Sequence, residues 1–464
     1  MKWGSRMRIL VCVKQVDGEV NPFDASALEC ALALPGAEVT LVSMGRPEVE
    51  ELLHRLARLG ARRAVLLTDP LFAGSDTLAT SYVLSLAAQK LRPDLILCGR
   101  QSVDSETAQV GPCLAALLGL PVVTGAMELD CAAGKARCLT RSGSESVTLP
   151  ALITVERGYK LRFPSLRARA CQVEVWSAEK LGADSARCGL RGSPTRVLRT
   201  YESAMGRRKC TFITPGELSG CIEQALQASR LPAAPQAAKR KLPAVWIVGP
   251  EPEEMARAVA ETVRLIPRQS PQKIAALARE EKPQAILWDS GPWGRRAAPQ
   301  AAALLQTGLC ADCTLLETDG ESLFMYRPAG GGSLTAKIVC RTSPQMATVR
   351  TTRQESGQVM VAVGAGAASA LPQIRRFVRE NGYSLAASRA LVDQDVMPYQ
   401  CQVGLTGKSV CPAVYIACGI SGAVQHTCAI RQAGTVIAVN ADRNARIFAY
   451  ADYGIVGDCA EIFG

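Results

Sequence analysis

The sequence predicts an α/β protein in which two related domains with parallel sheets precede a C-terminal, doubly wound α/β domain. Three observations support this class. Short apolar runs rich in β-branched residues alternate with amphipathic stretches along the 464 residues, as sheets flanked by helices require. One segment of the first half recurs in the second half. The last third places small and polar residues directly after its apolar runs.

The first domain contains segments typical of buried strands. Residues 8–13 (RILVCV), 38–44 (EVTLVSM) and 94–98 (DLILC) are short and apolar, and residues 47–60 between two of them are amphipathic. Buried strands and covering helices produce this alternation. The chain is long enough for roughly three such domains.

An internal repeat links residues 92–130 to residues 282–318. Both segments contain a proline, an apolar strand, a glycine-bearing loop, an Ala/Leu-rich helix, a Gly-Leu stop and a second apolar strand. A duplicated domain is the simplest explanation. Convergence of generic strand–loop–helix units is the alternative.

The segment between the two copies has the composition of a linker. It contains GLRGSPTRVLRTYE, a short helical pattern at 217–229, and PAAPQAAKRK. A third unit begins near 350 with an apolar run at 359–363 and a helical pattern that ends near 381. We therefore expect domains at 1–190, 243–349 and 350–464, with an arm and linker at 191–242.

Composition excludes several classes of protein. The net charge is +11, but Lys and Arg are scattered, and their local density at 187–209 and 239–241 favours a solvated linker over a nucleic-acid surface. Most of the 18 cysteines lie within apolar runs, which favours buried thiols over disulfides. The CxxC at Cys310 and Cys313 is isolated, and two histidines cannot form a multi-histidine metal site. Without a long apolar run or signal segment, we expect a soluble cytoplasmic protein.

Four segments of the third unit place small and polar residues directly after strands. They are residues 388–389, 402–408 (QVGLTGK), 419–426 (GISGAVQH) and 440–442 (NAD). Ligands of open α/β sheets bind beyond the carboxyl ends of strands, and small residues let backbone N–H groups approach phosphates. Each segment alone fits an ordinary strand-end turn, but together they favour a dinucleotide site.

Three side chains of this unit have two interpretations. His426 is either a structural histidine or a donor to a ligand carbonyl. Arg350 and Arg389 lie in apolar surroundings, where a guanidinium needs a partner. An anionic ligand or a buried carboxylate would serve equally well.

The first domain has a second pair of strand-end loops, at 21–32 and 98–111. Asp104, Thr107 and Gln109 are candidates to bind a ribose and a phosphate. The alternative is N-capping of the following helix by Asp104 and Thr107.

These motifs resemble the electron-transfer flavoprotein family. QVGLTGK, VYIACGISGAVQH, VIAVNAD and IFAYADYGIVGD resemble the FAD domain of the α subunit, and GLCADCT resembles that subunit's first domain. VCVKQV, NPFDASALE, GSDTLATS, GRQSVDSETAQVGP, RFPSL and GLRGSPTRV resemble the β subunit. The resemblance covers nearly the whole chain and implies a β subunit and an α subunit fused in one chain.

The resemblance also implies site residues. In the family, Arg389 would lie over the flavin, Thr406 near its N5 and His426 near its O2. The full set implied for FAD is Arg350, Ser388, Arg389, Gln402, Gly404, Thr406, Gly407, Ser421, Gly422, Ala423, Gln425, His426, Asn440 and Asp458. In the β-like part, the family binds AMP or a second FAD, which would involve Cys12, Asp104, Thr107, Gln109 and Gly111.

The sequence departs from the family's pattern at three places. Leu405 stands where glutamine is usual, VGAGAAS lacks a usual arginine, and Leu166, the expected partner-docking leucine, precedes Arg167 instead of proline. The first two changes bear on the FAD site, and the third bears on the docking partner.

The resemblance implies a soluble FAD-containing electron carrier between a dehydrogenase of the acyl-CoA dehydrogenase type and a downstream oxidoreductase. One alternative is an electron-bifurcating, NADH-oxidising flavoprotein with two FAD. Another is a nucleotide-binding module without a redox role.

Overall fold

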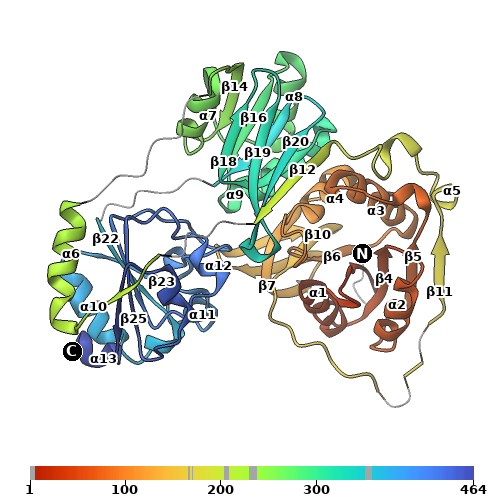
Figure 1. The fold of residues 1–464 in the computed structure, drawn as a ribbon. Helices are drawn as coiled ribbons and strands as arrows, with labels where there is room; N and C mark the ends of the chain where they lie inside the picture. Colours follow the sequence, from red (N-terminus) through yellow and green to blue (C-terminus); the bar gives the residue numbers. More distant parts are fainter. Residues whose placement is uncertain (1–5, 166–167, 170, 203–207, 229–237, 351–357) are drawn as a thin grey trace. The chain divides into compact units, whose positions relative to one another are not determined.

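The computed structural model describes residues 6–165, 168–169, 171–202, 208–228, 238–350 and 358–464. It contains two compact units (Figure 1). Unit 1 comprises Met1–Thr200, Ala237–Gly330 and Ala336–Val349, and unit 2 comprises Tyr201–Gln236, Gly331–Thr335 and Arg350–Gly464. The predicted α/β class is confirmed, because helices and parallel strands build both units. The domain limits near 190, 243 and 350 stay a prediction.

The first sheet of unit 1 has nine strands in the order β11-β5-β4-β1-β6-β10-β7-β8-β9. Neighbours from β11 to β7 are parallel, and β8 and β9 extend the sheet in antiparallel fashion. The strands are β1 (Met7–Cys12), β4 (Ala37–Met44), β5 (Arg63–Leu67), β6 (Leu95–Gly99), β7 (Val122–Ala132), β8 (Lys135–Thr140), β9 (Gly143–Thr148), β10 (Ala151–Val155) and β11 (Val173–Trp176). A small hairpin, β2 (Gln15–Val16) and β3 (Glu19–Val20), follows β1.

Strand β1 sends alternate side chains into two cores, one on each face of the sheet. Ile9 and Val11 pack in the core that contains α1 (Pro22–Ala33) and α2 (Val49–Ala57). Leu10 and Cys12 pack in the core that contains α3 (Thr77–Leu91), α4 (Val110–Leu118) and the short α5 (Ala178–Leu181). Both faces are covered, as a parallel sheet requires.

The second parallel sheet of unit 1 repeats the connectivity of the first. Its order is β15-β14-β16-β21-β17, which matches β4-β1-β6-β10-β7 strand for strand. The strands are β14 (Leu242–Val248), β15 (Ala260–Ile266), β16 (Ala285–Asp289), β17 (Leu309–Cys313) and β21 (Gln345–Val349), with helices α7 (Glu253–Val259), α8 (Pro271–Glu281) and α9 (Pro292–Leu305). A four-stranded sheet has the order β12 (Thr195–Glu202), β20 (Leu334–Cys340), β19 (Leu323–Ala329) and β18 (Leu315–Thr318).

A bulge recurs at the corresponding point of both parallel sheets. The register shifts between β10 and β7 and again between β21 and β17. Gly125 and Asp312 have positive φ angles of 72° and 56°, and their N–H groups donate to threonine hydroxyls at 2.9 and 2.8 Å. Cys310 and Cys313 flank the second bulge and are buried. The predicted relationship of the two domains is confirmed, and this CxxC consists of two packing cysteines.

Unit 2 has a six-stranded parallel sheet in the order β13-β26-β25-β24-β22-β23. The strands are β13 (Thr211–Phe212), β22 (Val359–Val363), β23 (Ser384–Ala387), β24 (Val414–Cys418), β25 (Thr435–Asn440) and β26 (Tyr453–Val456). The helices are α6 (Leu218–Gln227), α10 (Leu371–Glu380), α11 (Arg389–Asp393), α12 (Val424–Thr427) and α13 (Cys459–Ile462).

The two faces of this sheet are covered differently. One core contains Val361 with Ile222 of α6 and Ile374 of α10. The other contains Tyr415 and Met360 with residues of the irregular segments 403–410 and 429–433. Strand β13 and helix α6 come from the segment predicted to be arm and linker, so part of that segment completes this domain.

Candidate functional site

The strand order of unit 2 reverses at β22, because the chain continues to β23 on one side and to β24 on the other. Ligands of doubly wound sheets bind at such a point, beyond the carboxyl ends of the strands. The N–H of Gly364 donates to the carbonyl of Cys418 at 2.8 Å, and a Cβ on Gly364 would lie 2.3 Å from the oxygen of Gly419. Only glycine fits there, because the backbone after β22 lies directly against the backbone after β24.

The segment 402–408 folds into a loop at the same edge, where Gln402 bridges to Ala387 at the end of β23. Nε2 of the buried Gln402 donates to Oγ1 of Thr406 at 2.8 Å. A Cβ on Gly407 would lie 2.3 Å from the Gln402 oxygen, so the turn requires glycine there. Gln402, Thr406 and Gly407 are therefore brought together.

Arg350 holds this loop from within the domain. Its side chain is buried, and its guanidinium donates to the carbonyls of Leu405 at 2.6 Å and Gly404 at 3.4 Å and to Oγ of Ser409 at 3.3 Å. The N–H of Leu405 donates to the carbonyl of Gln425 at 2.6 Å. The loop is thus fastened to both Arg350 and α12, and the buried guanidinium brings a positive charge to this edge of the sheet.

His426 lies on α12 and is 7% exposed. Its Nε2 lies 2.8 Å from the hydroxyl of Tyr415, a fully buried residue of β24. Burial lowers the pKa of His426 to about 4, although its interaction with the Val403 backbone acts in the opposite direction. The ring is therefore neutral at pH 7 and can act as a hydrogen-bond donor but not as a charge.

Ser388 and Arg389 begin α11, directly after β23. The N–H of Ser388 donates to the carbonyl of Val363 at 2.8 Å, which ties α11 to the end of β22. Nε of Arg389 donates to the carboxylate of Asp393 at 2.9 Å. This second cation of the edge is half-exposed and is held by a carboxylate on its own helix.

The segment after β24 presents backbone and small side chains. Ser421, Ala423 and Gln425 are exposed, and Gly422 is buried with φ +84°. A Cβ on Gly422 would lie 2.2 Å from the nitrogen of Ile447. Gly422 therefore permits a close backbone contact that fixes the exposed residues beside it.

Asn440 and Asp458 lie at the ends of β25 and β26. Nδ2 of Asn440 donates to the carbonyl of Ile420 at 3.0 Å, and its Oδ1 accepts from the N–H of Asp442 at 3.0 Å. Asp458 is exposed and caps α13, accepting from the N–H of Ala460 at 2.8 Å. Asn440 thus braces the segment after β24, and Asp458 also serves as an ordinary helix cap.

The parallel sheet brings the sequence-predicted residues of unit 2 to one edge, because the carboxyl ends of parallel strands point the same way. Several features of this edge fit FAD: close backbone contacts at glycines, two guanidinium groups, a neutral imidazole, and polar side chains at the ends of β25 and β26. The residues at this edge are Arg350, Ser388, Arg389, Gln402, Gly404, Thr406, Gly407, Ser421, Gly422, Ala423, Gln425, His426, Asn440 and Asp458.

Unit 1 has an equivalent reversal between β1 and β6, where Cys12 and Cys98 are register partners. The carboxylate of Asp24 accepts from the N–H of Lys14 at 2.8 Å and of Gly99 at 3.0 Å, which joins the two strand-end loops. Burial raises the pKa of Asp24 to about 7 against the lowering effect of these hydrogen bonds. The carboxylate of Asp104, in the loop after β6, pairs at 2.6 Å with Nζ of Lys14, in the loop after β1.

Thr107 and Gln109 face a different part of unit 1. With Arg295 and Asp312 they line a cavity of about 10 Å³, and Nε2 of Gln109 donates to the carbonyl of Leu309 at 3.2 Å. Such a cavity has room for about one water molecule. Gly111 packs α4 against β10, since a Cβ there would lie 2.4 Å from Thr154 Cγ2. The structure therefore brings Cys12 and Asp104 to the strand ends but directs Gln109 elsewhere.

The N-capping alternative for this loop is wrong, because Gln109 occupies the N-cap position of α4. Sequence reasoning also missed Asp24, Asn21 and Tyr415. Asn21 is buried and donates to the carbonyl of Gln101 at 2.9 Å. Buried polar residues within apolar stretches are the signal that could have identified all three.

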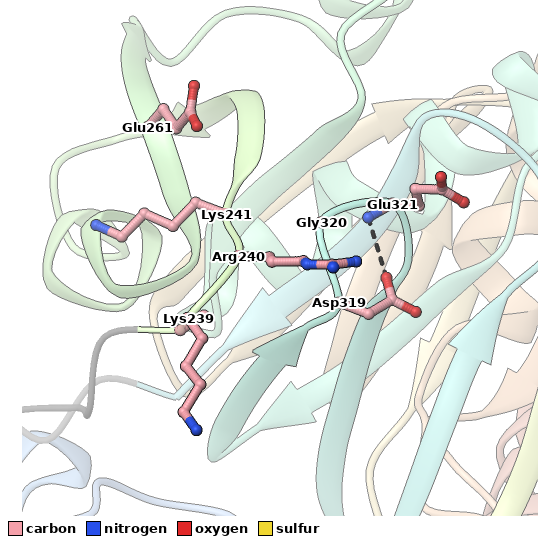
Figure 2. Close-up of a pocket in the computed structure, with 8 residues that line it drawn as sticks. Lys239, Arg240, Lys241, Glu261, Asp319, Gly320 and Glu321 are labelled. Atoms are coloured by element: carbon pink, nitrogen blue, oxygen red, sulfur yellow. Dashed lines mark hydrogen bonds between the residues drawn. The ribbon is translucent and has the colours of Figure 1, made fainter.

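A hollow of about 620 Å³ lies elsewhere in unit 1. Figure 2 shows Lys239, Arg240 and Lys241 on one side and Asp319 and Glu321 on the other. Nζ of Lys241 donates to the carbonyl of Arg257, and the Asp319 carboxylate accepts from the N–H of Glu321. The lining is of mixed charge and has no aromatic or large apolar side chain, so it does not suit a flavin ring.

Two other observations concern only the described ranges. None of the helices there has the length and apolar character needed to cross a bilayer. No group of three or more metal-binding side chains occurs there either. Leu166, predicted for partner docking, and Arg167 lie outside the described residues.

Comparison with known proteins identifies two kinds of domain in the chain. Residues 9–181 and 248–373, together more than half of the chain, match the electron transfer flavoprotein domain, and residues 354–431 match the electron transfer flavoprotein FAD-binding domain.

Three relatives illustrate the two halves. Protein FixA of Azorhizobium caulinodans is 40% identical over 45% of this chain and 88% of its own length. The electron transfer flavoprotein subunit beta of Clostridium acetobutylicum is 38% identical over 42% of this chain and 87% of its own. The subunit alpha of Thermoanaerobacterium thermosaccharolyticum is 37% identical over 41% of this chain and 71% of its own. With β-like and α-like parts in one polypeptide, the chain belongs to the electron transfer flavoprotein family.

Proposed function

We propose that the carboxyl edge of the unit 2 sheet binds one FAD and that the chain carries electrons from a flavin dehydrogenase, of the acyl-CoA dehydrogenase type, to a downstream oxidoreductase. The main support is that the 14 candidate residues lie at or beside one edge of this sheet, where Gly364, Gly419 and Gly422 allow close backbone contacts. The match of residues 354–431 to a FAD-binding domain supports the cofactor. When bound, FAD would supply the capacity to accept and release electrons singly.

The residues of the edge divide the work of binding. The phosphates are assigned to the backbone of 419–423, which close contacts of Gly419 with Ala367 and of Gly422 with Ile447 hold in place. Asn440 and Asp458 are assigned to the adenosine part. Arg350, Arg389, Thr406 and His426 are assigned to the ring, where fixed donors and positive charge favour negative charge on the cofactor.

We propose a nucleotide, AMP or a second FAD, at the β1–β6 strand ends of unit 1. This proposal is supported by the loops that Asp24 joins and by the ion pair of Lys14 with Asp104. A second FAD that is reduced by NADH would make the protein an electron-bifurcating flavoprotein. AMP in this site would favour the simple carrier.

The test is the visible spectrum and nucleotide content of the purified chain and two variants. S421A/Q425A changes exposed side chains at the proposed FAD edge, and D104A changes an exposed side chain in unit 1. We expect S421A/Q425A to retain less FAD than the wild type and D104A to leave the flavin of unit 2 bound. A colourless wild-type protein that contains only AMP would instead support a nucleotide-binding module without a redox role.

A double variant tests whether the proposed FAD depends on the cavity of unit 1 that Thr107 and Gln109 line. T107A/Q109A should leave the flavin of unit 2 in place, because both residues belong to unit 1. Loss of all flavin in that variant would contradict the two-site proposal.

A further inference from the structure

A buried polar pair lies in the apolar core beneath the proposed FAD edge. Tyr415 of β24 is fully buried, His426 of α12 is 7% exposed, and the tyrosine oxygen lies 2.8 Å from Nε2 of the ring. The surrounding core contains Met360, Val403 and Val410. Because the surroundings are apolar, each polar hydrogen of this pair needs an acceptor within the protein.

The direction of this hydrogen bond follows from counting hydrogens. A tyrosine hydroxyl carries one hydrogen, and a neutral imidazole carries one, on either Nδ1 or Nε2. In the part of the chain that the structure describes, Nε2 of His426 is the one acceptor within hydrogen-bond distance of the Tyr415 hydroxyl. If Nε2 carried the hydrogen and donated, the tyrosine hydrogen would be buried without an acceptor, which is unfavourable. The tyrosine therefore donates and Nε2 accepts.

The remaining ring hydrogen is then on Nδ1. Burial keeps the ring neutral at pH 7, because it lowers the pKa of His426 to about 4. The Val403 backbone acts against burial and raises that pKa. Val403 belongs to the loop 402–408 and packs in the same core as Tyr415, so the ring lies beside the loop of the proposed FAD edge.

We propose that Tyr415 is a positioning residue that donates to Nε2 of His426 and so holds the ring as the Nδ1–H tautomer, with its donor directed to the 402–408 side. A partner's hydrogen bond determines which imidazole nitrogen is protonated in the same way in other histidine sites. For the flavin, the inference rests on the proposed function: Nδ1–H becomes the donor that His426 can offer to a carbonyl oxygen of the ring.

The chain is well suited to a direct test, because His54 and His426 are its only histidines. The full-length protein would be labelled with ¹⁵N-histidine and studied by NMR at pH 7, both as purified and after removal of FAD. His54 is about half-exposed and serves as the internal reference. We expect a directly bonded proton on Nδ1 of His426 and none on Nε2, with or without FAD. A proton on Nε2 in the wild type would overturn the inference.

Y415F removes the hydroxyl and keeps the ring, and Y82F is the matched control. The Tyr82 hydroxyl, in unit 1, accepts from the N–H of Asp184 at 3.0 Å. We expect Y415F to give His426 a measurable population protonated on Nε2 and to make the first reduction potential of the bound flavin more negative, whereas Y82F changes neither. An unchanged tautomer in folded Y415F would also overturn the inference.

These measurements separate the inference from the proposed function. The Nδ1–H tautomer in a protein that purifies without any FAD would support the role of Tyr415 and contradict the proposed cofactor. Bound FAD together with Nε2–H would support the proposed cofactor and contradict the role of Tyr415.

Discussion

Acid should destabilise unit 2 through His426. The folded state holds this ring neutral with a pKa of about 4, whereas an unfolded chain titrates near the ordinary value of 6.5. Between these values the unfolded state binds more protons, so the free energy of unfolding falls as the pH falls from 6.5 to 4. At about 1.4 kcal/mol per pH unit, the loss over this interval is about 3 kcal/mol.

Unit 1 should respond in the opposite direction. Burial raises the pKa of Asp24 from 3.8 to about 7 in the folded state. The folded state therefore binds more protons between pH 4 and pH 7, and unit 1 loses stability as the pH rises through this interval, by about 4 kcal/mol.

The chain itself provides the means to separate the two units. Its five tryptophans, at positions 3, 176, 246, 288 and 293, all belong to unit 1. Urea unfolding followed by tryptophan fluorescence reports on unit 1, and hydrogen exchange in peptides from residues 414–430 reports on unit 2. H426Q should reduce the fall in the unfolding free energy of unit 2 between pH 6.5 and pH 4. It should leave the pH dependence of unit 1 unchanged. If H426Q does not alter the acid dependence of unit 2, the pKa of about 4 assigned to His426 is refuted.

Three further predictions follow from contacts of the two sites. D24N should remove most of the fall in unit 1 stability between pH 4 and pH 7, measured by the same fluorescence titration; a persistent slope would contradict the pKa assigned to Asp24. R350A should release the carbonyls of Leu405 and Gly404, destabilise unit 2 by about 3 kcal/mol and increase FAD loss on dialysis, with R350K as the control that keeps the charge. D393N should remove the carboxylate that pairs with Arg389 and make the flavin potential more positive by up to about 60 mV, whereas R389A should make it more negative. Equal potentials in both variants would contradict the placement of Arg389 at the ring.

The strands of both units could be predicted because their apolar runs are short, continuous and bounded by turn residues. The runs at 359–363 and 414–418 coincide with β22 and β24. The order of the strands within each sheet was not predicted from the sequence. The bulge at Cys310–Cys313 was not predicted, because it depends on a threonine hydroxyl supplied by a distant strand.

The partners of the site residues could not be predicted from the sequence, because they are far apart along the chain. Arg350 was expected to need a partner, but a buried carboxylate and a ligand were both open. The structure instead provides carbonyls of the 402–408 loop. Gln109 looked like part of a strand-end site, but its amide is directed to Leu309, in a segment 200 residues away. Asp24 and Tyr415 became visible as functional candidates only through their buried hydrogen bonds.

The most direct test of the central proposal is hydrogen exchange in the full chain before and after removal of FAD and after FAD is added back. FAD should slow exchange in the segments 402–408, 419–426 and 440–458, which meet at the carboxyl ends of the unit 2 strands. Unchanged exchange in all three segments, with protection confined to unit 1, would contradict the account.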